Sequence, residues 1–171
     1  MQFPEISTDR LTLRPTDVED ASFVRKLMNT PTWIQFIGDR EIHSDEDAHR
    51  YIREKIRPQF EQIGFSANTI IRKSDGSKIG TCGLHLKDGI DGYHIGFAFL
   101  PEYQQKGYGF EAASALLRFA EHRLDQTKLS AIVLAENTSS RLLREKWGVS
   151  YKRQITFEVD PVDLMLYEVW F

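Results

Sequence analysis

The heptapeptide YQQKGYG, residues 103–109, combines residue types that could bind an anion. Gly107 and Gly109 stand two positions apart, directly after two glutamines and Lys106. Glycine costs conformational entropy, so a pair of glycines at a junction favours tight backbone geometry or a closely approaching ligand. The stretch lies where a strand-like run, YHIGFAFL, meets a run with helical periodicity. A loop that leads into a helix N-terminus offers unpaired N–H groups and the positive end of the helix dipole, which favour a phosphate.

Two other interpretations of this stretch stay open. The simplest is an ordinary strand-to-helix turn that binds no ligand. The letters Gly107-x-Gly109-x-x-Ala112 also fit a dinucleotide-binding fingerprint, but that motif needs parallel βαβ winding, and the preceding segments have the pattern of antiparallel hairpins. A P-loop is excluded at this position because no Gly-Lys-Ser/Thr sequence follows.

The N-terminal third of the chain is predicted to be mainly helical. Thr16 and Glu19 have the spacing of a capping box, which predicts a helix over about 17–29. Ser44, followed by three acidic residues, predicts the start of a second helix, because acidic side chains favour the positive end of the helix dipole. Pro58 is expected to end or kink that second helix.

Most of the remaining pattern is typical of strands. They are predicted at RLTLR (10–14), FSANTIIR (65–72), KIGTCGLHL (78–86), YHIGFAFL (93–100), LSAIVLA (129–135), YKRQITFEV (151–159) and DLMLYEVWF (163–171). Asp75-Gly76 marks a hairpin turn, and Asp160-Pro161 marks the last turn. A helix over about 108–124 and a short one from Asn137 complete the set. This order predicts an α/β (α+β) fold with one mixed, mostly antiparallel sheet of about seven strands, flanked by about four helices.

Composition indicates an ordinary globular protein of one domain, spanning residues 1–171. Of the 171 residues, 41% are hydrophobic and 27% charged, and the net charge of −3 gives no reason to expect a nucleic acid or an anionic membrane as partner. Cys82 is the only cysteine, so an intrachain disulfide is impossible, which suits a reducing cytoplasm. The sequence lacks a secretory signal pattern and any apolar run of 18 residues.

Four segments, in order, resemble the GNAT (Gcn5-related) N-acetyltransferase superfamily. Gln104-x-x-Gly107-x-Gly109 looks like its motif A, which binds acetyl-coenzyme A through the pyrophosphate. TDRLTLRPTDVEDA, IGTCGL with YHIGFAFLPEYQQKGYGFEA, and ENTSSRLLREKWGV are similar to segments of the ribosomal-protein N-terminal acetyltransferase (RimJ/RimL-like) branch. The resemblance covers nearly the whole chain. It implies the GNAT fold and transfer of an acetyl group from acetyl-coenzyme A to a primary amine.

The resemblance also implies which residues bind the cofactor. Main-chain groups of 97–99, including Phe97 and Phe99, would pair with the pantetheine arm as an added strand would. Gln104 would begin the loop, and Asn137 would contact the cofactor arm near the reacting end, although Asn also suits a helix N-cap. The pyrophosphate would be bound by the amides of Gln105, Lys106, Gly107, Tyr108 and Gly109.

The resemblance leaves the proton-transfer groups partly open. Many family members have a tyrosine acid in the last helix, where this chain has Arg144. In the ribosomal-protein branch the serine of Asn-x-x-Ser takes that role, which implies Ser140 as the acid together with Asn137 as a catalytic residue; the ordinary alternative is that Ser140 is a capping or surface residue. The general base is expected among His85, His94, Glu158 or a chain of water molecules.

The two histidines are expected to face each other across the turn KDGIDG, opposite Leu84 and Ile95, as possible bases or as ordinary hydrogen-bonded residues of the sheet. Without a nearby carboxylate or cysteine they make a poor metal site, so no metal is predicted. Cys82, between small residues of a strand, is expected in the core.

The acceptor is not identified by the sequence. The segment TPTWIQFIGDREIHS (30–44) is apolar for a connection, so it either forms a wall of the acceptor groove or simply covers the core. A protein N-terminus and a small-molecule amine are both compatible acceptors, and the protein is expected to be a monomer or a homodimer. Two other functions remain: an acyl-coenzyme A sensor without catalysis, and, more distantly, a dinucleotide-dependent oxidoreductase.

Overall fold

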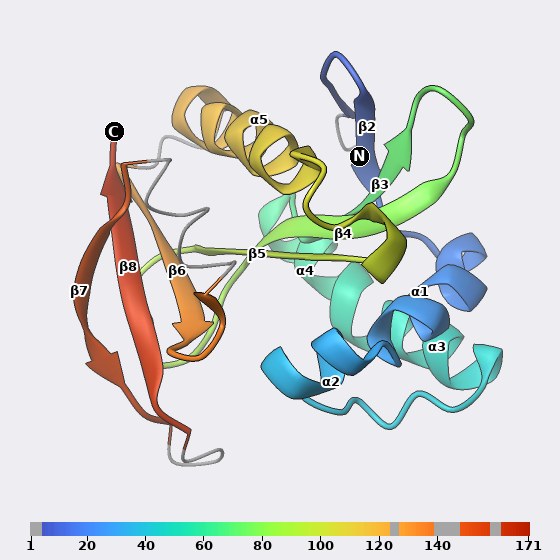
Figure 1. Ribbon diagram of the computed structural model, residues 1–171, viewed down its shortest axis with the longest axis horizontal. Coiled ribbons are helices and arrows are strands. Elements are labelled where there is room, and N and C mark those ends of the chain that lie inside the picture. The colour runs from blue at the N-terminus through green and yellow to red at the C-terminus, as the bar shows by residue number, and fades with distance from the viewer. Residues whose placement is uncertain (1–4, 124–126, 139–147, 158–161) are drawn as a thin grey trace.

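The computed structural model describes residues 5–123, 127–138, 148–157 and 162–171, and these form one eight-stranded sheet with helices on its faces (Figure 1). The strands lie in the order β1-β2-β3-β4-β5-β6-β8-β7, and all neighbours are antiparallel except β5 and β6. Their bounds are β1 (Ile6–Ser7), β2 (Leu11–Pro15), β3 (Ala67–Arg72), β4 (Lys78–His85), β5 (His94–Phe99), β6 (Lys128–Leu134), β7 (Ser150–Ile155) and β8 (Leu164–Trp170). The predicted mixed, mostly antiparallel sheet is confirmed, with the two-residue strand β1 in addition.

The helices pack on both sides of the central strands. In Figure 1, α5 lies on one side of β4 and β5, and α1, α2 and α3 lie on the other. Their bounds are α1 (Ala21–Met28), α2 (Pro31–Phe36), α3 (Asp45–Tyr51), α4 (Arg57–Ile63) and α5 (Tyr108–Arg123), with short 3₁₀ turns η1 (Val18–Asp20) and η3 (Pro101–Tyr103) and a π-helical segment η2 (Ile52–Ile56). Within these ranges no helix is both long and apolar enough to cross a membrane.

The N-cap of the first helical region is one residue later than predicted. Asp17, not Thr16, is the N-cap of η1, and its capping-box partner is Asp20 rather than Glu19. Thr16 is buried, and its hydroxyl is 2.9 Å from that of Thr69 in β3. The Thr16 side chain, which the local sequence pattern predicts as a cap, therefore forms a tertiary hydrogen bond instead.

The second helical region begins as predicted but continues past its proline. Ser44 and Asp47 form a capping box at the start of α3. Pro58 lies in the first turn of α4, after the π-helical turn, and the helix continues to Ile63. Because a proline is tolerated in the first turn of a helix, Pro58 marks an irregularity rather than an end. The connection before this region was predicted as a loop but contains α2, whose first turn is capped by the Thr30 side chain.

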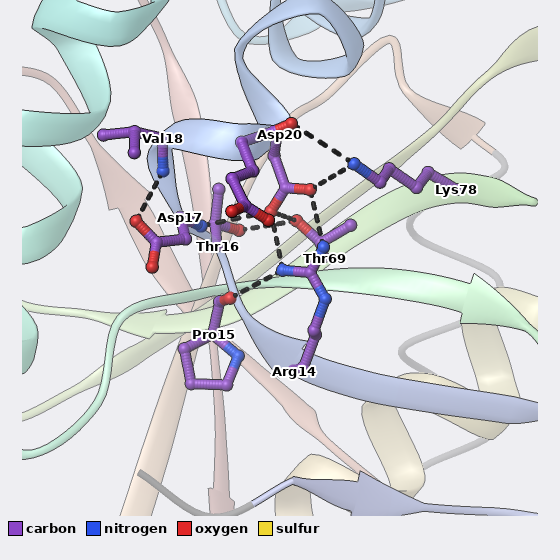
Figure 2. A network of polar contacts seen from close by, with 9 residues as sticks. Arg14, Pro15, Thr16, Asp17, Val18, Asp20, Thr69 and Lys78 are labelled. Carbon is purple, nitrogen blue, oxygen red and sulfur yellow. Dashed lines mark hydrogen bonds and ion pairs between the residues drawn. The ribbon is translucent and has the colours of Figure 1, made fainter. Parts of the chain in front are cut away.

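A buried carboxylate joins the helical layer to the sheet (Figure 2). The Asp20 side chain is completely buried, and its oxygens accept hydrogen bonds from Arg14 Nη2 at 2.7 Å and Nη1 at 2.8 Å. Lys78 Nζ lies 2.6 Å away, and Thr69 Oγ1 donates at 3.0 Å. Burial alone would raise the pKa of Asp20, but the hydrogen bonds from Arg14 and Lys78 outweigh it and lower the pKa to about 2. Asp20 is therefore ionised at neutral pH and ties η1 to β2, β3 and β4.

The hairpins and the central helix follow the predicted boundaries closely. β3 and β4 pair across the turn that contains Gly76, whose φ of +71° is left-handed. The apolar run of β6 is a central strand between β5 and β8. On α5, the inward positions are mostly alanine, which lets the helix pack closely on the sheet: Ala112, Ala113, Ala115, Leu116 and Ala120 are buried. The two closing strands are confirmed as β7 and β8, whereas the turn at 160–161 and the helix predicted from Asn137 lie largely outside the described residues.

Candidate active site

The parallel strands β5 and β6 pair over a short distance and then separate. Their register contains two pairs, His94 with Ser130 and Ile95 with Ala131. Beyond Ile95 both strands continue, and Figure 1 shows them diverging. The ladder to β6 therefore ends at Ile95, and the edge of β5 over 96–99 faces away from β4 toward the opening between the strands. Such a main-chain edge can pair with an extended ligand as it would with another strand.

The phosphate loop, defined here as residues 104–109, follows β5 after Leu100 and the 3₁₀ turn η3. Gln105 and Gly107 have left-handed φ values of +58° and +80°, and the first helical hydrogen bond of α5 runs from Glu111 N to Gly107 O at 3.1 Å. Gly109 lies within the first turn of α5. The amides of 105–107 donate no hydrogen bond to any residue that the structure describes. Together with the orphan amides of the first helical turn, they form a concave set of donors suited to an anion.

Gln104 connects the start of the loop to β5 and to α2. Its backbone N–H donates to Pro101 O at 3.2 Å, which closes the turn after β5. Its side-chain Nε2 donates to Phe99 O at 3.0 Å and lies 3.3 Å from Thr32 Oγ1 in α2. The glutamine predicted to begin the loop thus also connects the end of β5 to α2.

Basic and aromatic side chains surround the loop. Lys106 is exposed, and its Nζ lies 5.8 Å from the centre of the Tyr103 ring. The Arg72 guanidinium lies 4.9 Å from the centre of the same ring, and the Arg10 guanidinium lies 4.5 Å from that of Tyr108. Lys106 was predicted from the motif, but Arg10, just before β2, and Arg72, at the end of β3, were not, because both are far away in sequence. The donor set, amides with added positive charge, fits a diphosphate.

The two histidines face each other as predicted. His85 in β4 and His94 in β5 are register partners, and their ring centres are 5.5 Å apart. His94 is also a register partner of Ser130, so the pair lies at the point where β5 and β6 begin to separate. A Cβ on Gly96 would lie 3.5 Å from the His85 ring, so the ring lies directly beside the first residue of β5 beyond its ladder with β6. Burial lowers the pKa of His85 to about 4, so its imidazole is neutral at neutral pH.

The comparison with known proteins establishes the family. Residues 10–150 match the acetyltransferase (GNAT) domain. The chain belongs to the GNAT acetyltransferase family. It is therefore an acyltransferase, as the resemblance of its four segments implied.

Relatives of this GNAT acetyltransferase cover almost its full length. The uncharacterized N-acetyltransferase YoaA of Bacillus subtilis is 26% identical over 172 residues, which cover 98% of this chain and 97% of YoaA. The ribosomal-protein-S5-alanine acetyltransferase of Vibrio fischeri superposes with a TM-score of 0.82 at 14% identity, over 98% of this chain and 96% of that one. The microcin C7 self-immunity acetyltransferase MccE, in complex with acetyl-CoA and AMP, has a TM-score of 0.81 at 14% identity, with coverages of 96% and 94%. The structural matches show that the fold is shared.

Several predicted residues of the acetyltransferase are not placed together by the structure. Ser140, Glu158 and Arg144 lie outside the described residues. Asn137 is described: it is half-buried three positions after the end of β6, and its N–H donates to Leu134 O at 3.0 Å. Its proposed roles in catalysis and in cofactor binding therefore stay predictions. Cys82 is buried in the core, as expected.

The predicted acceptor wall divides into a buried part and an exposed part. In α2, Trp33 is buried, whereas Ile34 and, just after the helix, Ile37 are exposed. Trp33 thus covers the core, as one interpretation of this segment expected, whereas the acceptor-wall interpretation stays a prediction for the two exposed side chains. Across the described ranges, no three His, Cys, Asp or Glu side chains group so as to hold a metal ion.

Proposed function

We propose that this acyltransferase moves the acetyl group of acetyl-coenzyme A to a primary amine. The observation that carries the proposal is the parting of β5 from β6 after Ile95, upstream of a loop with left-handed residues at the N-terminus of α5. An extended ligand with a diphosphate at one end fits both parts at once. The fold shared with MccE, whose structure contains acetyl-CoA, supports the same ligand.

The cofactor-binding residues follow from this geometry and from the family resemblance. Main-chain groups of Phe97 and Phe99 would pair with the pantetheine arm. The amides of 105–109 would bind the diphosphate, with Gln104 holding the loop to β5. Asn137, three positions after the end of β6, would contact the arm from the side of that strand. When bound, the coenzyme would supply an activated thioester for the acceptor amine.

The chain must then place a neutral amine against the thioester and remove the proton of its ammonium form. His94 and His85 lie where β5 and β6 separate, and Glu158 and water remain the other candidates for the base. Because burial lowers its pKa to about 4, His85 holds a proton poorly at neutral pH, which makes it a weak general base. We keep Ser140 as the proposed acid that protonates the leaving thiolate.

The acceptor is either the N-terminal amine of a protein or a small-molecule amine. The fold shared with the S5-alanine acetyltransferase agrees with the first class, and the fold shared with MccE is compatible with the second. The exposed Ile34 in α2 and Ile37 just after it agree with an acceptor that carries an apolar group, because Gln104 connects α2 to the end of β5.

The proposal is tested by calorimetric titration with coenzyme A. The wild type should bind in the micromolar range that is common for enzyme substrates. Gly107→Glu should abolish binding, because Gly107 has a left-handed φ and a side chain there would press on Arg10 and place a carboxylate among the phosphate-binding amides. Gly92→Glu is the matched control, since Gly92 also has a left-handed φ but lies before β5, at the opposite end from the loop.

Unchanged affinity in Gly107→Glu would contradict the site. A second assay follows release of the coenzyme thiol with a panel of amines and of peptides that begin with Ser or Ala. Turnover with any of them supports the N-acetyltransferase. Tight binding of the donor without turnover across the panel would instead favour a sensor of acyl-coenzyme A.

A further inference from the structure

Arg10, from the turn before β2, supports the phosphate loop from behind. Its Nη1 donates to Lys106 O at 3.1 Å, so the guanidinium contacts the main chain in the middle of the loop. Its Nε donates to Glu111 Oε2 at 2.6 Å in the first turn of α5. The guanidinium plane lies over the Tyr108 ring, 4.5 Å from the ring centre. The Arg10 side chain thus contacts both the loop and the first turn of α5.

Glu111 holds Arg10 in this position. Its Oε1 accepts hydrogen bonds from Thr8 Oγ1 at 2.6 Å and from the backbone N–H of Arg10 at 2.9 Å. Burial alone would raise the pKa of Glu111, but the hydrogen bonds from Thr8 and Arg10 outweigh it, so its pKa is lowered and the carboxylate is ionised at neutral pH. The arginine is therefore fixed by charge-assisted bonds at both its backbone and its side chain.

The contact with Lys106 O determines the direction of the next amide. The chain contains no cis peptide among the described residues, and in a planar trans peptide the C=O and the following N–H point in opposite directions. Because Lys106 O points at Arg10, the N–H of Gly107 points to the opposite side, away from the guanidinium. A cation at the carbonyl end also polarises the peptide, which strengthens the N–H as a donor.

The shape of the loop agrees with this arrangement. A Cβ at Gly107 would lie 3.3 Å from Arg10 Nη2, which places the guanidinium directly behind the glycine. The left-handed φ of Gly107 lets the chain turn there into α5 while its carbonyl accepts the first helical bond from Glu111. Glycine is thus needed both for the backbone angle and for the close approach of Arg10.

We infer that Arg10 is a positioning residue for diphosphate recognition: by holding Lys106 O it aims the N–H of Gly107 at the diphosphate of the coenzyme. The inference rests on the proposed function, because it assigns the loop to that ligand. Arg10 acts through the loop and does not contact the pantetheine arm, which pairs with β5. Its loss should therefore weaken ligands that contain the diphosphate and leave those that lack it unaffected.

The test is an NMR titration of ¹⁵N-labelled full-length protein with coenzyme A and, separately, with pantetheine, which lacks the diphosphate. Binding of coenzyme A is read at the Gly107 amide, and binding of pantetheine at the amides of 97–99. In Arg10→Gln we expect the Kd for coenzyme A to rise about tenfold, as for a weakened hydrogen bond to a charged group, with the Kd for pantetheine unchanged. The Gly107 amide proton should also move upfield in the free variant, because its peptide is less polarised.

Two further variants separate positioning from general loss of structure. Arg10→Lys should recover part of the affinity, because an ammonium can reach Lys106 O or Glu111 but not both as the forked guanidinium does. Arg57→Gln is the matched control: Arg57 is as exposed as Arg10 and pairs with Asp17 at 3.1 Å, but it lies in α4. That variant should keep both affinities.

Two outcomes would overturn the inference while leaving the proposed function intact. One is an unchanged Kd for coenzyme A in Arg10→Gln. The other is an equal loss for both ligands, which would mean that Arg10 supports the site as a whole rather than the diphosphate contact. If the wild type itself fails to bind coenzyme A, the proposed function fails and the inference fails with it.

Discussion

Replacement of Asp20 by asparagine should destabilise the protein far more than the loss of a surface ion pair. In the native state the Asp20 carboxylate is completely buried and is held by Arg14, Lys78 and Thr69. The Asp20→Asn variant keeps the shape of the side chain but leaves two cations beside it without their shared counter-charge. Its amide group also turns a donor toward Arg14 Nη2, which now lies 2.7 Å from an acceptor oxygen.

The size of the effect can be worked out in two ways. The pKa of Asp20 is lowered from 3.8 to about 2, and this difference corresponds to about 2 kcal/mol of preference for the ionised form in the folded state. Removing one partner of a buried ion pair costs about 3–5 kcal/mol. The Arg14 and Lys78 side chains are a quarter to a third exposed and keep some hydration, which favours the lower end. We expect a loss of about 3 kcal/mol in the free energy of unfolding.

The assay is urea unfolding at pH 7, followed by circular dichroism, with Asp45→Asn as control. Asp45 pairs with Arg25 at 3.0 Å, but both side chains are about half exposed, so its loss should cost less than about 1 kcal/mol. A loss in Asp20→Asn no larger than that of the control would refute the reasoning.

The same variant has a defined pH dependence. Because the pKa of Asp20 is lowered in the folded state, its stabilising effect is present above pH 3.8 and is lost as the pH falls toward about 2. The difference in stability between wild type and Asp20→Asn should therefore shrink across that window. A difference that stays constant from pH 5 to pH 2 would contradict the assignment.

Two further predictions concern the central strands. Burial lowers the pKa of His85 from 6.5 to about 4, so between these pH values the unfolded chain binds a proton that the folded chain does not. As the pH falls through that range, the free energy of unfolding of the wild type should drop by up to about 3 kcal/mol relative to that of His85→Gln. Thermal melts at a series of pH values that change in parallel for the two proteins would contradict this prediction. Gly83→Val should cost about 3 kcal/mol or more, because a Cβ there would lie 2.7 Å from the Ala67 Cα and closer still to Ser66 O. Gly96→Ala, whose Cβ would make an ordinary 3.5 Å contact with the His85 ring, should unfold at nearly the wild-type urea concentration, and equal losses in the two glycine variants would contradict the steric argument.

The parts of the fold that local patterns control could be predicted from the sequence. Alternating strands separated by Asp75-Gly76, and the periodic run of α5 after a glycine-rich loop, lie close to their expected bounds. That His85 and His94 face each other could be predicted from hairpin geometry alone. The loop proposed to bind phosphate could be suggested from the sequence because its residues are consecutive, within 103–109.

Features that depend on distant partners could not be predicted. Thr16 has the spacing of a cap, but its hydroxyl is taken by Thr69, 53 residues away. Arg10 is 96 residues from the carbonyl that it holds, and no local signal connects the two. The separation of β5 from β6 after Ile95 depends on the packing of whole strands, and each strand has an ordinary apolar pattern. The sequence therefore indicated which ligand to expect but not how the loop is supported.

The tie between the N-terminal strands and α5 has a consequence for how the protein matures. Thr8 and Arg10 form hydrogen bonds with Glu111 across 103 and 101 residues of chain. The residues that hold the loop are therefore synthesised long before the loop itself. These contacts can form only after α5 has been synthesised, when β1 and β2 come to lie beside it. A shortened chain that begins at β3 would keep every residue of the glycine motif and still lack the part that holds it in position.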